Sequence, residues 1–310
     1  MVPLWQDTRK AKLMNQHQQH KPQAAKPRWL KRRLPTGPAY ENVRALLSKS
    51  RLHTVCQEAR CPNLWECFSR QTSTFLIMGP YCTRNCRFCN VTHGPSGPTD
   101  PEEPARVAEA VKSLKLSYVV ITSVTRDDLP DGGAGLFAKT IKAIRTRIPG
   151  TLVEVLIPDF QGNKDALQKV ITAHPEVLNH NLETVPRLYP SVRPQANYRR
   201  SLLLLKRARR FDTSIPTKSG LMLGLGELPE EVEKTLQDLL EAGCSILTLG
   251  QYLQPTKEHL NVERFIPPAE FDEWKKIALA MGFAEVASGP LVRSSYHAKD
   301  LYQTLTNKDA

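Results

Sequence analysis

Six of the seven cysteines lie between Cys56 and Cys89. They form two groups of three, namely Cys56, Cys61 and Cys67 (the first triad), and Cys82, Cys86 and Cys89 (the second triad). Three thiolates on one short segment can hold a metal or an iron–sulfur cluster, whereas a disulfide framework uses cysteines in pairs. The grouping therefore predicts two metal or cluster sites rather than a set of disulfides.

The second triad follows an apolar, strand-like run at residues 74–79. If that run is the first strand of a barrel, its loop lies at the carboxyl end of the strand, where barrel active sites are found. Three thiolates leave one iron of a four-iron cluster open to a substrate or cofactor. Zinc is the alternative, but it would need a fourth Cys or His nearby, and His93 lies in a turn rich in Gly and Pro.

The segments that must position these cysteines alternate between strand and helix patterns. Strand-like runs are expected at 74–79, 118–123, 152–157, 176–181, 220–225 and 246–250. Helices are expected at 102–114, 229–242 and 268–281, because Pro marks their starts and Gly follows the last two. Such alternation predicts an α/β fold with a parallel sheet, here a partial (β/α)6 TIM-type barrel.

Composition limits the class of protein. The chain has 310 residues, 40% of them hydrophobic, which suits one barrel-sized domain. No apolar run is long enough to cross a bilayer and no signal peptide is visible, so we expect a cytoplasmic protein. The formal charge of +12 indicates an acidic protein partner or nucleic acid. No basic motif with interleaved aromatic residues supports nucleic acid.

The Cys-x3-Cys-x2-Cys loop with Phe88 resembles the signature of radical S-adenosylmethionine enzymes, and the chain from about residue 28 to 298 resembles the lipoyl synthase family. The runs that carry this second resemblance are residues 52–67, 120–124, 126–129, 179–183, 217–226, 250–255 and 293–298. One departure is Thr125, which stands where the family usually has an aspartate; Asp127 and Asp128 follow it.

The resemblance implies two [4Fe–4S] clusters and S-adenosylmethionine as cofactors. The second triad would hold the cluster that binds S-adenosylmethionine, and the first triad with Ser295 would hold an auxiliary cluster across the barrel mouth. We expect an N-terminal extension (29–73), the barrel (74–287) and a C-terminal extension (288–310); the composition of residues 1–28 predicts a flexible basic arm, which the resemblance does not explain. The implied reaction inserts sulfur at C6 and C8 of a protein-bound octanoyl-lysine, using 5′-deoxyadenosyl radicals and consuming the auxiliary cluster.

Residues mostly at successive strand ends are expected to contact S-adenosylmethionine, namely Asn90, Thr122, Ser123, Asn181, Glu183, Lys218, Met222, Gln251 and Arg293. Met222 would contribute its backbone, and Arg293 would approach either the cofactor or the auxiliary cluster. Cys244, the cysteine outside both triads, is expected to be a buried, inert thiol.

The resemblance also implies protein partners. They are octanoylated lipoyl carrier domains of 2-oxoacid dehydrogenases or the glycine cleavage H protein, an electron donor such as ferredoxin or flavodoxin, and an iron–sulfur carrier that repairs the auxiliary cluster. Carrier domains are expected to be acidic, which gives the positive charge a use. A non-catalytic iron–sulfur carrier is the alternative function.

Overall fold

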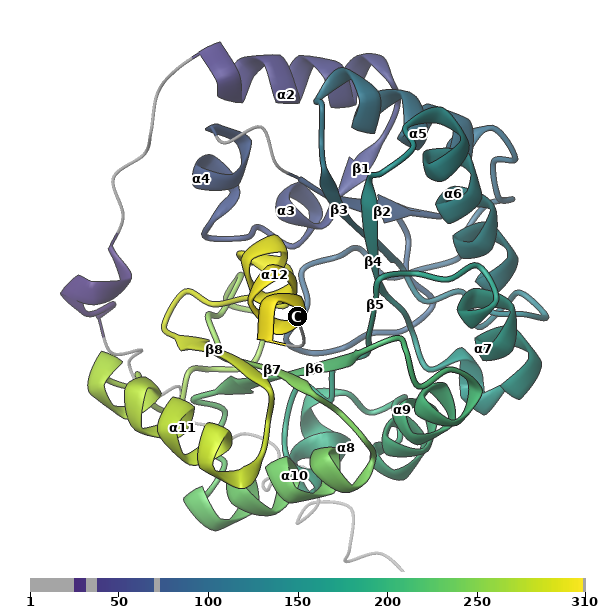
Figure 1. Cartoon of the computed structure of the whole chain (residues 1–310). Helices are drawn as coiled ribbons and strands as arrows, with labels where there is room; N and C mark the ends of the chain where they lie inside the picture. The colour runs from purple at the N-terminus through teal and green to yellow at the C-terminus, as the bar shows by residue number, and fades with distance from the viewer. Residues whose placement is uncertain (1–24, 32–37, 70–72, 309–310) are drawn as a thin grey trace, which may run out of the picture.

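The computed structural model describes residues 25–31, 38–69 and 73–308, so most of the predicted basic arm lies outside the described residues. One eight-stranded sheet, in the order β1 to β8, curves around the centre of the molecule (Figure 1). Its strands are β1 (His53–Thr54), β2 (Thr74–Ile77), β3 (Tyr118–Ser123), β4 (Leu152–Leu156), β5 (Val177–Asn179), β6 (Thr217–Leu223), β7 (Ile246–Gln251) and β8 (Glu285–Gly289). Strands β2 to β8 pair in parallel and β1 pairs antiparallel to β2, which makes an open barrel.

Helices surround this sheet on its outer side (Figure 1). Those that alternate with the strands are α5 (Glu103–Ser113), α6 (Ala134–Arg147), α7 (Lys164–Ile171), α8 (Tyr189–Val192), α9 (Tyr198–Phe211), α10 (Pro229–Glu241) and α11 (Pro268–Met281). The remaining helices are α2 (Pro38–Lys49), α3 (Val55–Glu58), α4 (Leu64–Ser69) and α12 (Ala298–Lys308), with short 3-10 turns η1 (Arg28–Leu30), η2 (Phe160–Gly162) and η3 (Pro186–Leu188). All three predicted helices are confirmed, as α5, α10 and α11.

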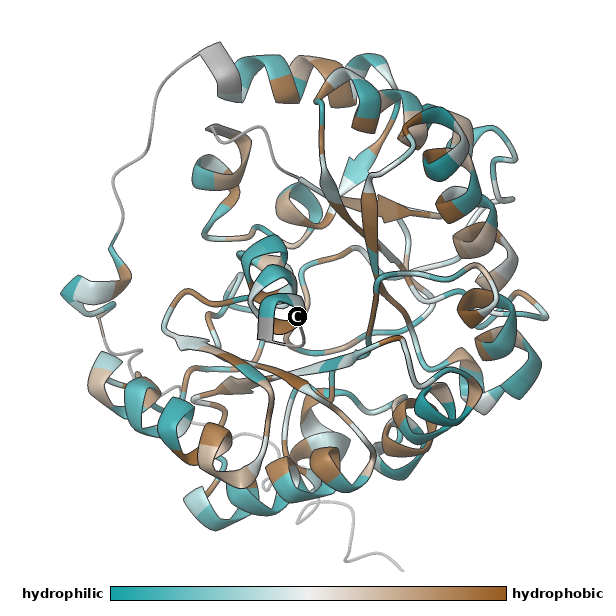
Figure 2. Ribbon diagram, in the orientation of Figure 1, coloured by the Kyte–Doolittle hydropathy of each residue, from teal (hydrophilic) through white to brown (hydrophobic). Residues whose placement is uncertain are grey.

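The core lies between the sheet and these helices. Figure 2 shows hydrophobic residues on the helix faces that meet the sheet and hydrophilic residues on the faces that point outward. Val107, Phe137, Ile141, Leu236 and Phe271 are fully buried in this layer. Burying one such side chain contributes about 1.5–3 kcal/mol relative to leaving it exposed, so this layer holds the barrel in shape.

Three strands differ from the sequence prediction. The two-residue strand β1 was not predicted. The structure adds β8, a further parallel strand that crosses the predicted boundary between barrel and C-terminal extension. Strand β6 starts at Thr217 rather than at residue 220. Its first residues are polar but buried, because Lys218 pairs with Glu154 of β4 at 3.0 Å, and Tyr118 donates to the same carboxylate at 2.7 Å. The prediction missed this start because it required an apolar run.

The chain after β8 turns into the barrel and runs past several strands. The carbonyl oxygen of Val292 would lie only 2.1 Å from a Cβ atom on Gly250 of β7, so no side chain fits at that position. Further along, Ser294 meets Asn181 after β5, and Ser295 meets Thr74 at the start of β2. This segment places C-terminal residues inside the cavity of the barrel.

Candidate functional site

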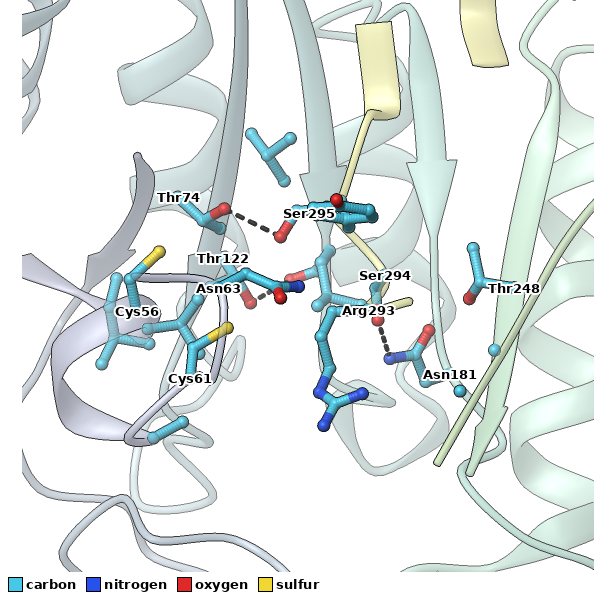
Figure 3. A pocket seen from close by; sticks show the side chains of 18 of the residues that line it. Cys56, Cys61, Asn63, Thr74, Thr122, Asn181, Thr248, Arg293, Ser294 and Ser295 are labelled. Atoms are coloured by element: carbon cyan, nitrogen blue, oxygen red, sulfur yellow. Dashed lines mark hydrogen bonds between the residues drawn. The ribbon is translucent and has the colours of Figure 1, made fainter. Parts of the chain in front are cut away.

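A cavity of about 880 Å³ occupies the barrel and is lined by all six clustered cysteines. In Figure 3, Cys56 and Cys61 lie on one side, Asn181 and Thr248 lie on the other, and residues 293–295 run between them. The cavity therefore brings together the two cysteine triads and the C-terminal segment, which are far apart in the sequence.

The loop of the second triad is anchored to neighbouring loops by its backbone. The amide of Cys82 donates to the carbonyl of Thr92 at 2.8 Å, and its carbonyl accepts from the amide of Gly94 at 3.0 Å. The amide of Thr83 donates to the carbonyl of Thr125, and the amide of Thr125 donates to the Cys82 sulfur at 3.3 Å. Thr125 thus supports the loop through its main chain, which any residue type could supply.

A buried ion-pair network holds the middle of the same loop. The Arg84 side chain is 4% exposed and donates to Asp127 and to Asp159, each at 2.6 Å. Arg200 also reaches Asp159, at 2.8 Å. Burial alone would raise the pKa of Asp159, but the hydrogen bond and charge of Arg84 outweigh it and hold that pKa well below its usual range. The Asp159 carboxylate therefore stays ionised, and its ion pair together with that of Asp127 fixes Arg84 between the triad cysteines.

The thiols of the second triad lie in a desolvated environment. Burial raises the pKa of Cys89 to about 12, and the nearby Cys86 and Cys82 add to the shift. Burial also raises the pKa of Cys86. Without metal the Cys86 and Cys89 thiols stay protonated at neutral pH, and a bound iron centre would displace their protons, because thiolate is the form that ligates metal.

The first triad is spread over two short helices and their connection. Cys56 lies in α3, whose N-cap Thr54 accepts from the amide of Gln57, and Cys67 lies in α4. The amide of Cys61 donates to the Cys56 carbonyl at 3.0 Å, which folds the connection back on α3. Burial raises the pKa of Cys56, and Cys61 and Cys67 are near enough to raise it further. The three sulfur atoms therefore face a common region.

The first triad lies near the amino end of β2. Strand β1 runs antiparallel to β2, so the chain leaving it toward Cys56 heads for that end, and the backbone of Thr74 hydrogen-bonds the Cys56 sulfur. The Thr74 hydroxyl donates to Ser295 at 2.8 Å (Figure 3). Since a strand rises about 3.3 Å per residue, the ends of β2 are about 10 Å apart. The two triads thus lie at opposite ends of β2. This differs from our expectation that the auxiliary cluster lies across the barrel mouth.

The donor sets fit clusters better than a single ion. Within residues 25–31, 38–69 and 73–308, no three His, Cys, Asp or Glu side chains are close enough to hold one metal ion. A cluster distributes its thiolates over several irons, so sulfurs spaced around a cavity wall suit it, whereas zinc needs four ligands at one point. The first triad has the Ser295 hydroxyl nearby as a candidate fourth ligand. The sequence predicted no fourth protein ligand for the second triad.

Unsatisfied polar atoms occur in both parts of the cavity, at Asn63 and Ser73 near the first triad and at three residues on the other side. The Ser123 hydroxyl, the Asn181 amide oxygen and the Nε atom of Arg193 are buried and have no hydrogen-bond partner within the described chain. All three residues line the cavity. Because a buried polar atom without a partner is costly, these atoms indicate the binding position of a polar ligand.

Glu183 adds a carboxylate to this part of the cavity. Its backbone adopts a left-handed conformation with φ of 68°. Asn181 donates to Glu183 at 3.0 Å and to Ser294 at 2.5 Å (Figure 3). Burial raises the pKa of Glu183, and the charges of Arg193 and Arg293 oppose that rise. A ligand carrying an amine or hydroxyl groups would find both a donor and an acceptor here.

Most of the residues predicted to contact S-adenosylmethionine line the cavity, and two do not. Asn90, Thr122, Ser123, Asn181, Glu183, Met222 and Arg293 line it. Lys218 and Gln251 lie elsewhere: Lys218 is paired with Glu154 in the barrel interior, and the Gln251 amide donates to the carbonyls of residues 223, 252 and 264. Their predicted position at strand ends did not indicate contact with the cofactor. Lys218 lies near the start of its strand, and the Gln251 side chain hydrogen-bonds the backbone of a loop.

Other lining residues were not predicted. Arg193 donates to the carbonyls of Asn181 and Leu182 at 2.8 and 3.0 Å, and His180 is buried between Ile157 and Ser201. Arg84 could have been predicted as a site residue, because it lies between Cys82 and Cys86 in the sequence. No sequence pattern around Arg193 distinguishes it from other arginines. Cys244 is buried as predicted, and burial raises its pKa to about 12.

Comparisons with known proteins agree with this arrangement. Residues 76–239 match the model of the radical SAM superfamily, and residues 4–61 match that of the N-terminal domain of lipoyl synthase. A lipoyl synthase of Desulfotalea psychrophila is 59% identical over 278 residues, covering 90% of this chain and 93% of the relative. One from Rubrobacter xylanophilus is 55% identical over 275 residues, covering 89% and 86%.

Solved structures share the fold at low identity. Streptococcus suis SuiB bound to S-adenosylmethionine matches with a TM-score of 0.54 at 11% identity, over 80% of this chain and 54% of that one. HydG, a maturase of the [FeFe]-hydrogenase, matches with a TM-score of 0.53 at 14% identity, over 84% and 74%. Among the described residues, no helix is long and apolar enough to span a membrane.

Proposed function

The chain belongs to the lipoyl synthase family of the radical SAM superfamily, and from that premise we propose which of its residues carry the reaction. The reaction is the insertion of two sulfur atoms, at C6 and C8, into a protein-bound octanoyl-lysine chain. The cofactors are two [4Fe–4S] clusters and S-adenosylmethionine. Alkyl C–H bonds have no acidic proton and no leaving group, so acid–base and nucleophilic groups cannot activate them.

We assign one cluster to each triad. Cys82, Cys86 and Cys89 would hold the cluster that binds S-adenosylmethionine, and the first triad with Ser295 would hold the auxiliary cluster. When bound, the cluster of the second triad supplies the electron that generates a 5′-deoxyadenosyl radical from S-adenosylmethionine. The auxiliary cluster, on the first triad, supplies the sulfur. The observation that carries this assignment is the one cavity lined by both triads, in which the Ser295 hydroxyl meets Thr74, the residue whose backbone hydrogen-bonds the Cys56 sulfur.

The chain's other residues position the reactants. Ser123, Asn181 and Arg193 offer unsatisfied polar atoms to S-adenosylmethionine, and Glu183 supplies a carboxylate to its polar groups. The buried walls exclude water from a radical that would otherwise react with solvent or protein. The triads lie at opposite ends of β2, a strand about 10 Å long, which leaves room for an acyl chain between them.

We extend the proposal to the partners, domains and location. Residues 29–73 and the chain after β8 act as extensions that complete the auxiliary site, around a barrel that starts at residue 74 and runs through β8. The substrate is an octanoylated carrier domain. An electron donor such as ferredoxin or flavodoxin and an iron–sulfur carrier for cluster repair would serve the enzyme in the cytoplasm, where thiols stay reduced.

The test is anaerobic reconstitution followed by three measurements. We expect about eight irons per chain, formation of 5′-deoxyadenosine that depends on reductant, and conversion of an octanoyl-lysine peptide to the lipoyl product by mass spectrometry. The Cys244→Ala variant is the control and should behave like the unmodified chain, because Cys244 lies outside the cavity. Bound iron without 5′-deoxyadenosine formation would instead favour a non-catalytic iron–sulfur carrier.

A further inference from the structure

The cavity opens to solvent on the side of the first triad. Its most exposed lining residues are Lys26, Arg60, Lys115, Ser117, His297, Lys299 and Asp300. Lys26 precedes η1, Arg60 follows α3, Lys115 and Ser117 lie in the turn before β3, and residues 297, 299 and 300 lie at the start of α12 or just before it. By contrast, every lining residue contributed by the loop from Cys82 to Cys89 is buried or half-buried. A large substrate therefore finds its widest approach on the side of the first triad.

The charges around this opening are mostly positive. We call Lys26, Arg60, Lys115 and Lys299 the cationic mouth. Within the described part of the chain, Lys26, Arg60 and Lys115 form no ion pair, and Lys299 donates to the Ser117 hydroxyl at 2.8 Å. The one exposed acid in the lining, Asp300, is already engaged by His297 at 2.7 Å. The mouth therefore presents uncompensated cations to an approaching partner.

Beneath the mouth the wall becomes apolar. Leu114 and Leu116, which flank Lys115, and Ala298, which precedes Lys299, are buried and line the cavity together with Val120. Helix α12 lies over the centre of the ring of strands in Figure 1, and its Tyr302 ring packs against Tyr118 at the start of β3. A charged rim around a cavity with apolar inner walls suits the binding of an aliphatic chain that is attached to a charged protein surface.

We propose that an acidic carrier domain docks on the cationic mouth and inserts its acyl-lysine arm from the side of the first triad, opposite the S-adenosylmethionine position. This inference rests on the proposed function and adds the route and the docking surface of the substrate. The arm passes the first triad on its way inward, so the acyl carbons reach both triads without displacing S-adenosylmethionine. Complementary charges around the mouth speed encounter and hold the carrier in register.

The experiment compares two double variants of the reconstituted enzyme. Lys115→Glu/Lys299→Glu reverses two charges of the mouth, and Lys206→Glu/Lys275→Glu reverses two exposed lysines on α9 and α11 that do not line the cavity. The dissociation constant for an octanoylated carrier domain is measured by fluorescence anisotropy, together with KM for the carrier and for a short, neutral octanoyl-lysine peptide.

We expect the mouth variant to bind the carrier about tenfold more weakly and to raise the ratio of carrier KM to peptide KM about as much, because rim charges act on the carrier and not on the peptide. The control variant should change the dissociation constant by about twofold or less. Equal weakening by both variants, or no weakening by the mouth variant, would overturn the docking surface. Failure of the unmodified enzyme to convert either substrate would contradict the proposed function instead.

A milder pair guards against loss of folding. If the charge-reversed mouth variant does not fold, Lys115→Gln/Lys299→Gln removes the charges without adding acids. It should weaken carrier binding about threefold at low ionic strength, and that loss should shrink as salt is raised, because salt screens exposed charges. A loss that is independent of salt would contradict docking by charge.

Discussion

The two cysteine triads are built in different ways. The second triad lies on one loop, whose contacts run to neighbouring barrel loops and to the buried Arg84 network. The first triad is spread over α3, α4 and their connection, and it meets residues from the far end of the chain. Asn63 donates to the Leu291 carbonyl at 2.7 Å, and Tyr296 donates to Glu66 at 3.1 Å.

This difference suits different tasks. A cluster used repeatedly benefits from a rigid loop that is complete within the barrel. A cluster that gives up sulfur benefits from a site assembled from two chain ends, which can separate without unfolding the barrel. Adjacent serines of the C-terminal segment have different partners, since Ser294 faces Asn181, which also contacts Glu183, and Ser295 faces Thr74 on the side of the first triad (Figure 3).

Removing one thiol from each triad, in separate variants, should distinguish the roles of the two triads most clearly. We expect Cys86→Ala to abolish 5′-deoxyadenosine formation, and Cys61→Ala to retain it while abolishing sulfur insertion. Each variant should lose about half of the iron, because each triad is assigned one four-iron cluster. The measurements are iron analysis and chromatography of the nucleoside product. Loss of 5′-deoxyadenosine in Cys61→Ala would show that the two sites are not independent.

The rigidity of the second loop is tested by removing its buried cation. Arg84→Met should lower the free energy of unfolding by about 3–5 kcal/mol, because it leaves Asp127 and Asp159 without their partner. Urea unfolding under anaerobic conditions measures this loss. The control is Arg147→Met, since the Arg147 pair with Glu109 is exposed on both sides and should contribute about 1 kcal/mol or less. Similar losses in both variants would contradict a special role for the Arg84 network.

Acid sensitivity should also belong to the cofactor side of the barrel. Burial, aided by the charge of Arg193, lowers the pKa of His180 to about 4 from an unfolded value near 6.5. Between these values the unfolded chain binds a proton that the folded chain does not, so stability falls as pH drops from about 6.5 to 4, by about 3 kcal/mol.

Urea unfolding at pH 7, 5.5 and 4.5 measures that slope. His180→Asn keeps a donor for the Ile157 carbonyl but cannot titrate, so this variant should lose most of the slope in this window. A slope that is unchanged in His180→Asn would assign the acid sensitivity to another group.

The smallest effect is expected at Ser294. Ser294→Ala removes one partner of the Asn181 amide while Glu183 remains, which should weaken S-adenosylmethionine binding by about 1 kcal/mol, or about fivefold. Equilibrium binding measures this change, and Ser294→Thr, which keeps a hydroxyl, should restore part of it. The auxiliary iron should stay in place. Loss of half of the iron would show that Ser294, rather than Ser295, ligates the auxiliary cluster.

Much of the fold followed from local patterns. The predicted helices and the order of strands depend on apolar periodicity and on Pro and Gly at helix ends, which act within a few residues. The start of β6 was missed because the buried Lys218 and Glu154 satisfy each other across the barrel, and no local rule reveals a partner in another strand. For the same reason Lys218 was placed at the cofactor site, whereas it lies in the barrel interior.

By itself, the sequence determined the two triads, the barrel class and the family, because these depend on residue types and on short spacings. Only the tertiary structure decided that the triads lie at opposite ends of β2, that Ser294 and Ser295 face different partners, and that Arg193 lines the cavity. Contacts such as Thr74 with Ser295 join residues more than two hundred positions apart. Packing of the whole chain forms such contacts, and no local pattern encodes them.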